Sequence, residues 1–183
     1  MDLFAEEGYD ETTVDEIADR AGISRRSFFR YFSSKRDLMA SGILEYGTAL
    51  TNAIRACPPR SPVSEVIRHT VLQVAHQCTA LPQTRKVMQI VSKYAAAKEA
   101  LNSRDAELRE RVEAAFVSRG GAFRVLAPGL LTDLTLAILD VVFHYWFKHG
   151  GQDARTAADQ VWVALGCMVG FKPVPSGPRS ARR

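Results

Sequence analysis

Three arginines lie within six residues of this chain, Arg25, Arg26 and Arg30, and no acidic residue occurs over positions 20–36. A helix turns by about 100° per residue, so a helix through this segment places all three guanidinium groups on one side, around the ring of Phe29. Guanidinium groups read guanine edges through two hydrogen bonds and neutralise phosphates. These residue types at this spacing therefore indicate a face that contacts DNA in the major groove.

The opposite side of the same helix is expected to pack against the preceding helix. That side consists of Ser24, Ser27, Phe28, Tyr31 and Phe32. The alternative interpretation is an ordinary helical hairpin with a solvated basic face. The turn and the helix caps described next favour the DNA-binding interpretation.

Local signals predict the helices that position this face. Thr13 followed by Glu16 is a capping box for a helix that begins at residue 14. Gly22 ends that helix, because a tight turn is least costly for a residue without Cβ. Ser24 caps the arginine-bearing helix, and a third helix is expected to begin near Ser34. Two short helices joined by a tight turn are typical of a helix-turn-helix.

These segments resemble the DNA-binding domain of the TetR/AcrR family of one-component transcription regulators, over about residues 3–45. The matching motifs are Thr12-Thr13, Ile17-Ala18, Ala21-Gly22-Ile23-Ser24, Phe28-Phe29-Arg30-Tyr31-Phe32 and Ser34-Lys35. The aromatic run is similar to that of actinobacterial members, including mycofactocin-type regulators, which are associated with acyl-CoA effectors. The resemblance implies a transcription regulator, most simply a ligand-released repressor that binds a palindromic operator as a homodimer.

The resemblance also implies which residues contact DNA. They are Arg25 and Arg26 at base edges, Thr13, Ser27, Tyr31 and Lys35 at the backbone, and Phe29 through apolar contact with a thymine methyl or a sugar. Phe29 departs from the family, which very often has tyrosine there. The helix before Gly8 is also short, at about two turns, and must depend on packing. Either a late start codon or a real truncation would explain it.

The rest of the chain predicts further helices, so the expected fold class is all-α. A helix is expected over residues 36–56 and a break at 57–62. Amphipathic segments then follow, the last two at 131–149 and 153–171. We expect a helix-turn-helix domain at 1–45, a helical effector-binding and dimerisation domain at 46–171, and a disordered basic tail at 172–183. The tail carries four basic and no acidic residues, which equals the net charge of +4. The DNA prediction therefore rests on local placement of charge.

The last two helices are apolar on more than one face, which requires burial on several sides. In the family, two C-terminal helices pair with their copies in a four-helix bundle, so we expect a homodimer through residues 131–149 and 154–170. An apolar or amphipathic small-molecule effector is expected among the helices. Its candidate contacts are Tyr94, Phe116, Phe143, His144, Trp146 and Trp162, although each is also a plausible core residue.

Several other classes of function find little support in the sequence. Cys57, Cys78 and Cys167 form no metal or disulfide pattern. His69 and His76 are seven residues apart rather than four, so we expect no metal site. There is no motif of an enzyme and no sign of a bound cofactor.

Location and the alternative function also follow from the sequence. The N-terminus lacks a signal-peptide pattern, and the apolar stretch 130–147 contains enough polar residues to favour a buried helix over a membrane span. A cytoplasmic protein is expected. The alternative function is an all-helical interaction or ligand-binding protein whose short first helix has cost it DNA binding.

Overall fold

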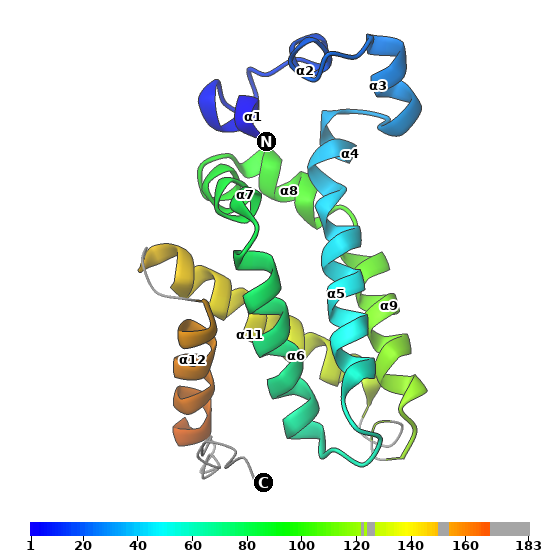
Figure 1. The fold of residues 1–183 in the computed structure, drawn as a ribbon, viewed down its shortest axis with the longest axis vertical. Coiled ribbons are helices and arrows are strands. Elements are labelled where there is room, and N and C mark those ends of the chain that lie inside the picture. Colours follow the sequence, from blue (N-terminus) through cyan, green and yellow to red (C-terminus); the bar gives the residue numbers. More distant parts are fainter. Residues whose placement is uncertain (122, 124–126, 150–153, 169–183) are drawn as a thin grey trace, which may run out of the picture.

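The computed structural model describes residues 1–121, 123, 127–149 and 154–168, and every regular element in this part of the chain is an α-helix (Figure 1). The helices are α1 (Asp2–Glu6), α2 (Val14–Arg20), α3 (Arg25–Tyr31), α4 (Lys35–Ala40), α5 (Gly42–Ala56), α6 (Val63–Thr79), α7 (Pro82–Lys93), α8 (Ala95–Asn102), α9 (Asp105–Ser118), α11 (Pro128–Lys148) and α12 (Ala154–Met168). The predicted all-α class is confirmed. The predicted tail at 172–183 lies outside the described residues, as does the end of the last predicted helix.

One predicted helix is interrupted in the structure, and the chain after Pro82 is also divided. The segment 36–56 divides at Ser41, whose Oγ donates a hydrogen bond to the carbonyl of Leu38 at 2.7 Å and so competes with the backbone. The segment that follows Pro82 divides at Tyr94, which has extended backbone angles, and again at 103–104. The predicted domain boundary after residue 45 falls inside α5. One helix therefore leads from the N-terminal part into the body of the molecule.

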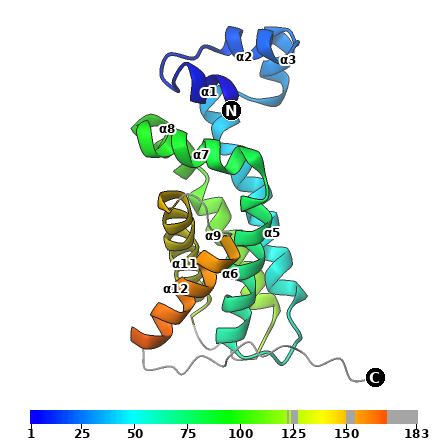
Figure 2. The same cartoon turned by 60° about the vertical axis from the view of Figure 1, so that its left-hand side comes forward.

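The main hydrophobic core is built by α5, α6, α9, α11 and α12. Leu50, Ile54, Val74, Phe116 and Leu139 are fully buried in it. Figure 2 shows these long helices gathered below the small N-terminal group formed by α1, α2 and α3. Burying a side chain of this size stabilises the fold by about 1.5–3 kcal/mol.

A second, smaller cluster joins the N-terminal helices to the body. Phe4 and Tyr9, whose ring centroids are 5.0 Å apart, pack in one cluster with Met39 of α4, Ile90 of α7 and Ala97 of α8. The short α1 is therefore anchored by tertiary packing, as its length requires. The alternative function assumed that a short first helix weakens the motif, and this packing argues against that assumption.

Helix α11 is long and apolar enough to cross a membrane, by length and composition only. The sequence-based expectation that its polar residues would exclude this was too strict. Seven of its side chains are buried in the described structure, and a core helix of a soluble protein passes the same test. Several large apolar side chains nevertheless remain exposed on α11 and α12, namely Leu130, Leu134, Val141 and Val163.

Candidate nucleic-acid interface

The predicted caps that shape the helix-turn-helix are present. The Thr13 hydroxyl accepts the Glu16 N–H at 3.3 Å, and the Glu16 carboxylate accepts the Thr13 N–H at 2.7 Å. The Thr13 N–H, followed by the Thr13 hydroxyl, donates to the Glu16 carboxylate and so holds the pKa of Glu16 below its usual value. Gly22 adopts the left-handed region with φ +67°, and the Ser24 hydroxyl accepts the Ser27 N–H at 3.1 Å. The caps thus fix both ends of the turn between α2 and α3.

The buried side of α3 is narrower than predicted. Phe28 is buried and packs beside Phe32, with ring centroids 5.6 Å apart. Tyr31 was expected on this side, but it is 66% exposed, so that prediction is wrong. Tyr31 is the last residue of a helix of only seven residues, and its hydroxyl accepts a hydrogen bond from Arg30 at 2.9 Å. An exposed Tyr31 is compatible with the predicted contact to a DNA backbone.

The exposed side of α3 carries the residues predicted to face DNA. Arg25, Arg26, Phe29 and Arg30 are all exposed, and the Phe29 ring stands edge-on to buried Phe28. Arg25 lies over the Phe29 ring at 5.5 Å and forms an ion pair with Asp15 of α2 at 2.6 Å. Arg26 makes no ion pair or hydrogen bond with another described residue. No sequence pattern indicated that Arg25 pairs with Asp15, which lies ten positions earlier.

Two of the predicted backbone-contacting residues are already engaged within the protein. The Lys35 ammonium donates to the carbonyls of Tyr9 and Asp10, both at 2.8 Å, and of Thr12 at 3.0 Å. All three of its N–H groups are then occupied, which leaves none for a phosphate. Lys35 is therefore better described as a clamp on the α1–α2 connection. The Thr13 hydroxyl also donates a hydrogen bond to the Glu16 carboxylate, at 2.8 Å. Ser27 is half-buried, so only the exposed part of its side chain can contact DNA.

The residues predicted to bind an effector do not converge on one cavity. Tyr94 packs in the small N-terminal cluster, where its hydroxyl oxygen would lie 2.7 Å from a Cβ built on Gly8. Phe116 is fully buried and stacks on Phe123, while His144 is exposed. Trp146 is buried beneath the Arg85 guanidinium at 4.8 Å. A single pocket formed by the six residues is thus not found in the described structure.

One part of the interior does combine a predicted effector residue with polar groups. Phe143 of α11 and Tyr46 of α5 have ring centroids 6.1 Å apart, and both line the main core, as does Trp162 of α12. Burial raises the pKa of the Tyr46 phenol, and the nearby Cys78 and Asp140 act in the same direction. Burial also raises the pKa of the Cys78 thiol to about 11. Neither group is charged at neutral pH, so this region presents neutral, polarisable groups in an apolar setting.

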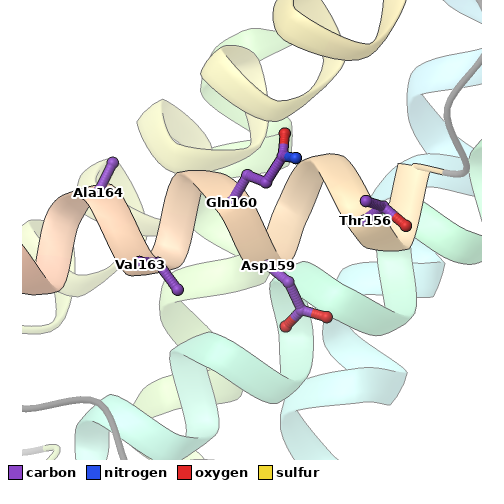
Figure 3. A pocket seen from close by; sticks show the side chains of 5 residues that line it. All are labelled: Thr156, Asp159, Gln160, Val163 and Ala164. Atoms are coloured by element: carbon purple, nitrogen blue, oxygen red, sulfur yellow. The ribbon is translucent and has the colours of Figure 1, made fainter.

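The described surface contains a hollow of about 420 Å³ along α12, lined by Thr156, Asp159, Gln160, Val163 and Ala164 (Figure 3). None of the six predicted effector residues lines it. All five lining residues belong to one helix, so the hollow has a single wall. It is a poor container for a small ligand and a better match for a second helix laid against α12.

No group of three or more histidine, cysteine or acidic side chains is placed to hold a metal ion in the described part of the chain. His69 is half-buried and His76 is exposed.

Comparison with known proteins identifies the N-terminal helices. Residues 1–41 match the sequence model of the bacterial regulatory proteins of the tetR family. The HTH-type transcriptional regulator TcmR of Streptomyces glaucescens is 34% identical over 58 residues, 32% of this chain and 26% of TcmR. A putative mycofactocin biosynthesis transcriptional regulator, MftR of Mycobacterium tuberculosis, is 51% identical over 35 residues, 19% of this chain and 18% of MftR. The chain thus spans about a quarter or less of these relatives in the matched regions.

The remaining chain is similar to the family in fold. Thermus thermophilus FadR, described as a TetR-family transcriptional repressor in complex with lauroyl-CoA, superposes with a TM-score of 0.55 at 21% identity. The match covers 100% of this chain and 95% of FadR. At this identity the match establishes the fold alone. The helix-turn-helix at residues 1–41 therefore belongs to the tetR family of bacterial regulatory proteins, and the chain as a whole has the fold of TetR-family structures.

Proposed function

We propose that this protein binds operator DNA through α3 and regulates transcription in the cytoplasm, most simply as a repressor. The observation that carries the proposal is the exposed face of α3, which carries Arg25, Arg26, Phe29 and Arg30, with Arg25 over the Phe29 ring. Arginine at the start of a recognition helix can reach base edges, while exposed Tyr31 and partly exposed Ser27 are suited to the phosphate backbone. Thr13 lies beside the N-terminus of α2 and stays a predicted backbone contact.

The dimer we propose uses the outer faces of α11 and α12. Leu130 and Leu134 are 65% and 46% exposed on α11, Val141 is 52% exposed, and Val163 on α12 is 49% exposed. Large apolar patches on a soluble protein mark interaction sites. A two-fold pair through these helices would present two copies of α3 to successive major grooves, about 34–36 Å apart or a multiple of that distance. The operator should then be a near-palindrome.

DNA selection from a random-sequence pool, followed by sequencing, tests both proposals. We expect the wild-type protein to enrich a near-palindromic site and to sediment as a dimer at micromolar concentration. Val141→Glu should shift the protein toward monomer and weaken binding, whereas Leu81→Glu, which alters an exposed leucine that belongs to neither α11 nor α12, should change neither. Failure to enrich any sequence would reject DNA recognition, and a monomeric wild-type protein would reject the dimer.

We also propose that an apolar or amphipathic small molecule binds beside Tyr46 and Phe143 and releases DNA. The support is the location of Tyr46 on α5, the helix that joins the main core to α4 and the N-terminal helices. The structure of FadR, a relative in fold, is a complex with lauroyl-CoA, and this supports an acyl chain as the class of effector. A ligand releases DNA only if it binds the two arrangements of the dimer with different affinity, and about 1–3 kcal/mol of coupling is typical.

A further inference from the structure

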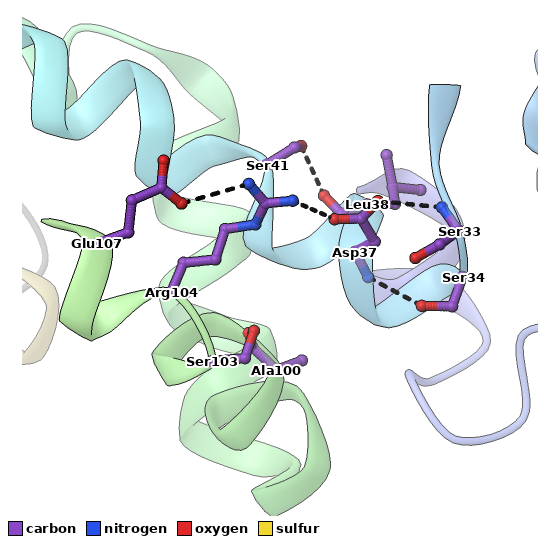
Figure 4. Close-up of polar contacts among 9 residues, drawn as sticks. All are labelled: Ser33, Ser34, Asp37, Leu38, Ser41, Ala100, Ser103, Arg104 and Glu107. Atoms are coloured by element: carbon purple, nitrogen blue, oxygen red, sulfur yellow. Dashed lines mark hydrogen bonds and ion pairs between the residues drawn. The ribbon is translucent and has the colours of Figure 1, made fainter. Parts of the chain in front are cut away.

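The turn between α8 and α9 meets the start of α4 through an ion pair that also reaches the recognition helix. The Arg104 guanidinium donates to one oxygen of the Asp37 carboxylate at 2.6 Å (Figure 4). The other oxygen of Asp37 accepts the backbone N–H of Ser33 at 3.0 Å. One carboxylate therefore joins Arg104 of the body to Ser33, in the α3–α4 connection.

Ser33 is close to the functional surface. It follows Phe32, the residue that ends α3, and precedes Ser34, whose hydroxyl accepts the Asp37 N–H at 3.2 Å. The Asp37 carboxylate and backbone N–H thus form hydrogen bonds with Ser33 and Ser34, the two residues before α4. The Ser33 N–H, followed by Arg104, holds the pKa of Asp37 below its usual value, so the carboxylate is charged at neutral pH. The direction of α3 relative to α4 depends on these hydrogen bonds.

The ion pair between Arg104 and Asp37 is less exposed than the ion pair between Arg36 and Glu99, which connects the same two parts of the molecule. The side chains of Arg104 and Asp37 are only 33% and 22% exposed. Arg36 and Glu99, which join α4 to α8, are 52% and 74% exposed. Neither side chain forms a hydrogen bond with the α3–α4 connection in the described structure. Exposed ion pairs contribute about 0–1 kcal/mol, whereas partly buried pairs with additional hydrogen bonds hold geometry more firmly.

The other side of Arg104 faces the body of the molecule. Arg104 is the residue before α9, and its guanidinium also lies 3.6 Å from Glu107 in the first turn of that helix. Helix α9 packs against α5 and α11, the helices that carry Tyr46 and Phe143. A displacement of α9 would therefore move the guanidinium that holds Asp37.

We propose that Arg104 is a positioning residue for DNA recognition, acting through Asp37 and the Ser33 N–H to fix the orientation of α3 relative to the body. The proposal rests on DNA binding by α3. It assigns a role to a side chain that contacts no DNA and lies 67 positions from its partner. Arg104 also supplies a path by which a change at α9 reaches the recognition helix.

Arg104→Gln tests this role, with Arg36→Gln as the matched control because Arg36 forms the exposed ion pair that joins α4 to α8. We expect Arg104→Gln to weaken binding to the duplex selected by the wild-type protein by about 2- to 30-fold, the range typical of coupling mutations away from a ligand. The Ser33 amide should exchange its hydrogen faster in Arg104→Gln than in wild type. Arg36→Gln should leave both measurements near wild type, and Arg104→Lys should restore part of the binding.

A second variant keeps the test decisive if Arg104→Gln is poorly folded. Asp37→Asn retains an oxygen for the Ser33 N–H but loses the charge that holds Arg104, so it should reproduce the loss of affinity. The double variant should bind no more weakly than the weaker single variant. Equal Ser33 exchange and equal affinity in Arg104→Gln and Arg36→Gln would overturn the proposal. If the wild-type protein selects no DNA, DNA recognition itself fails, and the exchange measurement still decides whether Arg104 orders the connection.

Discussion

Arg25 and Arg26 are consecutive and exposed, but their surroundings differ. The Asp15 carboxylate pairs with Arg25 at 2.6 Å, and the two side chains are 63% and 57% exposed, so the pair contributes at most about 1 kcal/mol. When the protein binds DNA, that carboxylate would compete with the DNA for Arg25. We expect Asp15→Asn to strengthen binding to the selected duplex by up to about fivefold, measured as the dissociation constant at fixed salt.

The control for that change is Glu6→Gln, which removes the same charge from the exposed ion pair between Glu6 and Arg20. It should alter DNA affinity less than Asp15→Asn. In an Arg25→Ala background the gain from Asp15→Asn should largely disappear, because the carboxylate then has no arginine to compete for. Weaker binding by Asp15→Asn would mean that Asp15 orients Arg25 for its base contact and does not compete for it.

At the scale of elements, the start of α4 holds the α1–α2 connection through Lys35 and three backbone carbonyls. Lys35→Met should lower the free energy of unfolding by about 1–3 kcal/mol, since hydrogen bonds to a charged group are lost while the aliphatic stem is kept. Chemical denaturation measures this change. The slope of log affinity against log salt should stay near wild type, because the three N–H groups of Lys35 are bonded to carbonyls.

Arg26→Ala provides the comparison for Lys35→Met, because Arg26 has no partner among the described residues and is free to approach a phosphate or a base. Its loss should reduce the salt slope if it displaces a counterion, by about 0.9 for one phosphate contact. A reduction of that size in Lys35→Met would support the phosphate contact that the family resemblance implies for Lys35. It would contradict the role of Lys35 as a clamp on the α1–α2 connection.

The whole molecule is connected by α5, which begins directly after α4 and ends within the main core. Trp146 is 6% exposed in that core, and its truncation would destabilise the fold by about 3–5 kcal/mol, so a smaller change is needed to probe the effector. Tyr46→Phe removes only a hydroxyl. We expect it to reduce release of the selected duplex by lauroyl-CoA while leaving DNA affinity without lauroyl-CoA near wild type. Release that is unchanged in Tyr46→Phe would exclude this hydroxyl from the effector site.

The sequence was a good guide where the relevant interactions are local. The capping box at Thr13 and Glu16, the Ser24 cap and the break before Val63 all depend on residues within a few positions of one another, and all are found in the structure. The resemblance to the family, which the comparisons confirm, came from the same short segment.

What the sequence could not supply depends on contacts between distant residues. Lys35 meets carbonyls 23 to 26 positions earlier, and Arg104 meets Asp37 across 67 positions. No periodicity or motif reports such pairs. Aromatic residues in the body were equally ambiguous, because core packing and ligand contact select the same residue types. Tyr94 shows this, since its ring closes the contact between the N-terminal helices and the body.

The contact between Tyr94 and Gly8 limits how this protein can change over generations. Gly8 has φ +103°, a backbone angle that other amino acids rarely adopt. Every other amino acid would also add a Cβ about 2.7 Å from the Tyr94 hydroxyl oxygen, so two independent effects disfavour substitution at position 8. Replacing the tyrosine by phenylalanine in a descendant would remove the closest contact but would leave the ring carbon Cζ at 3.3 Å and the backbone angle unfavourable. Among descendants of this protein, glycine at position 8 should therefore persist longer than tyrosine at position 94.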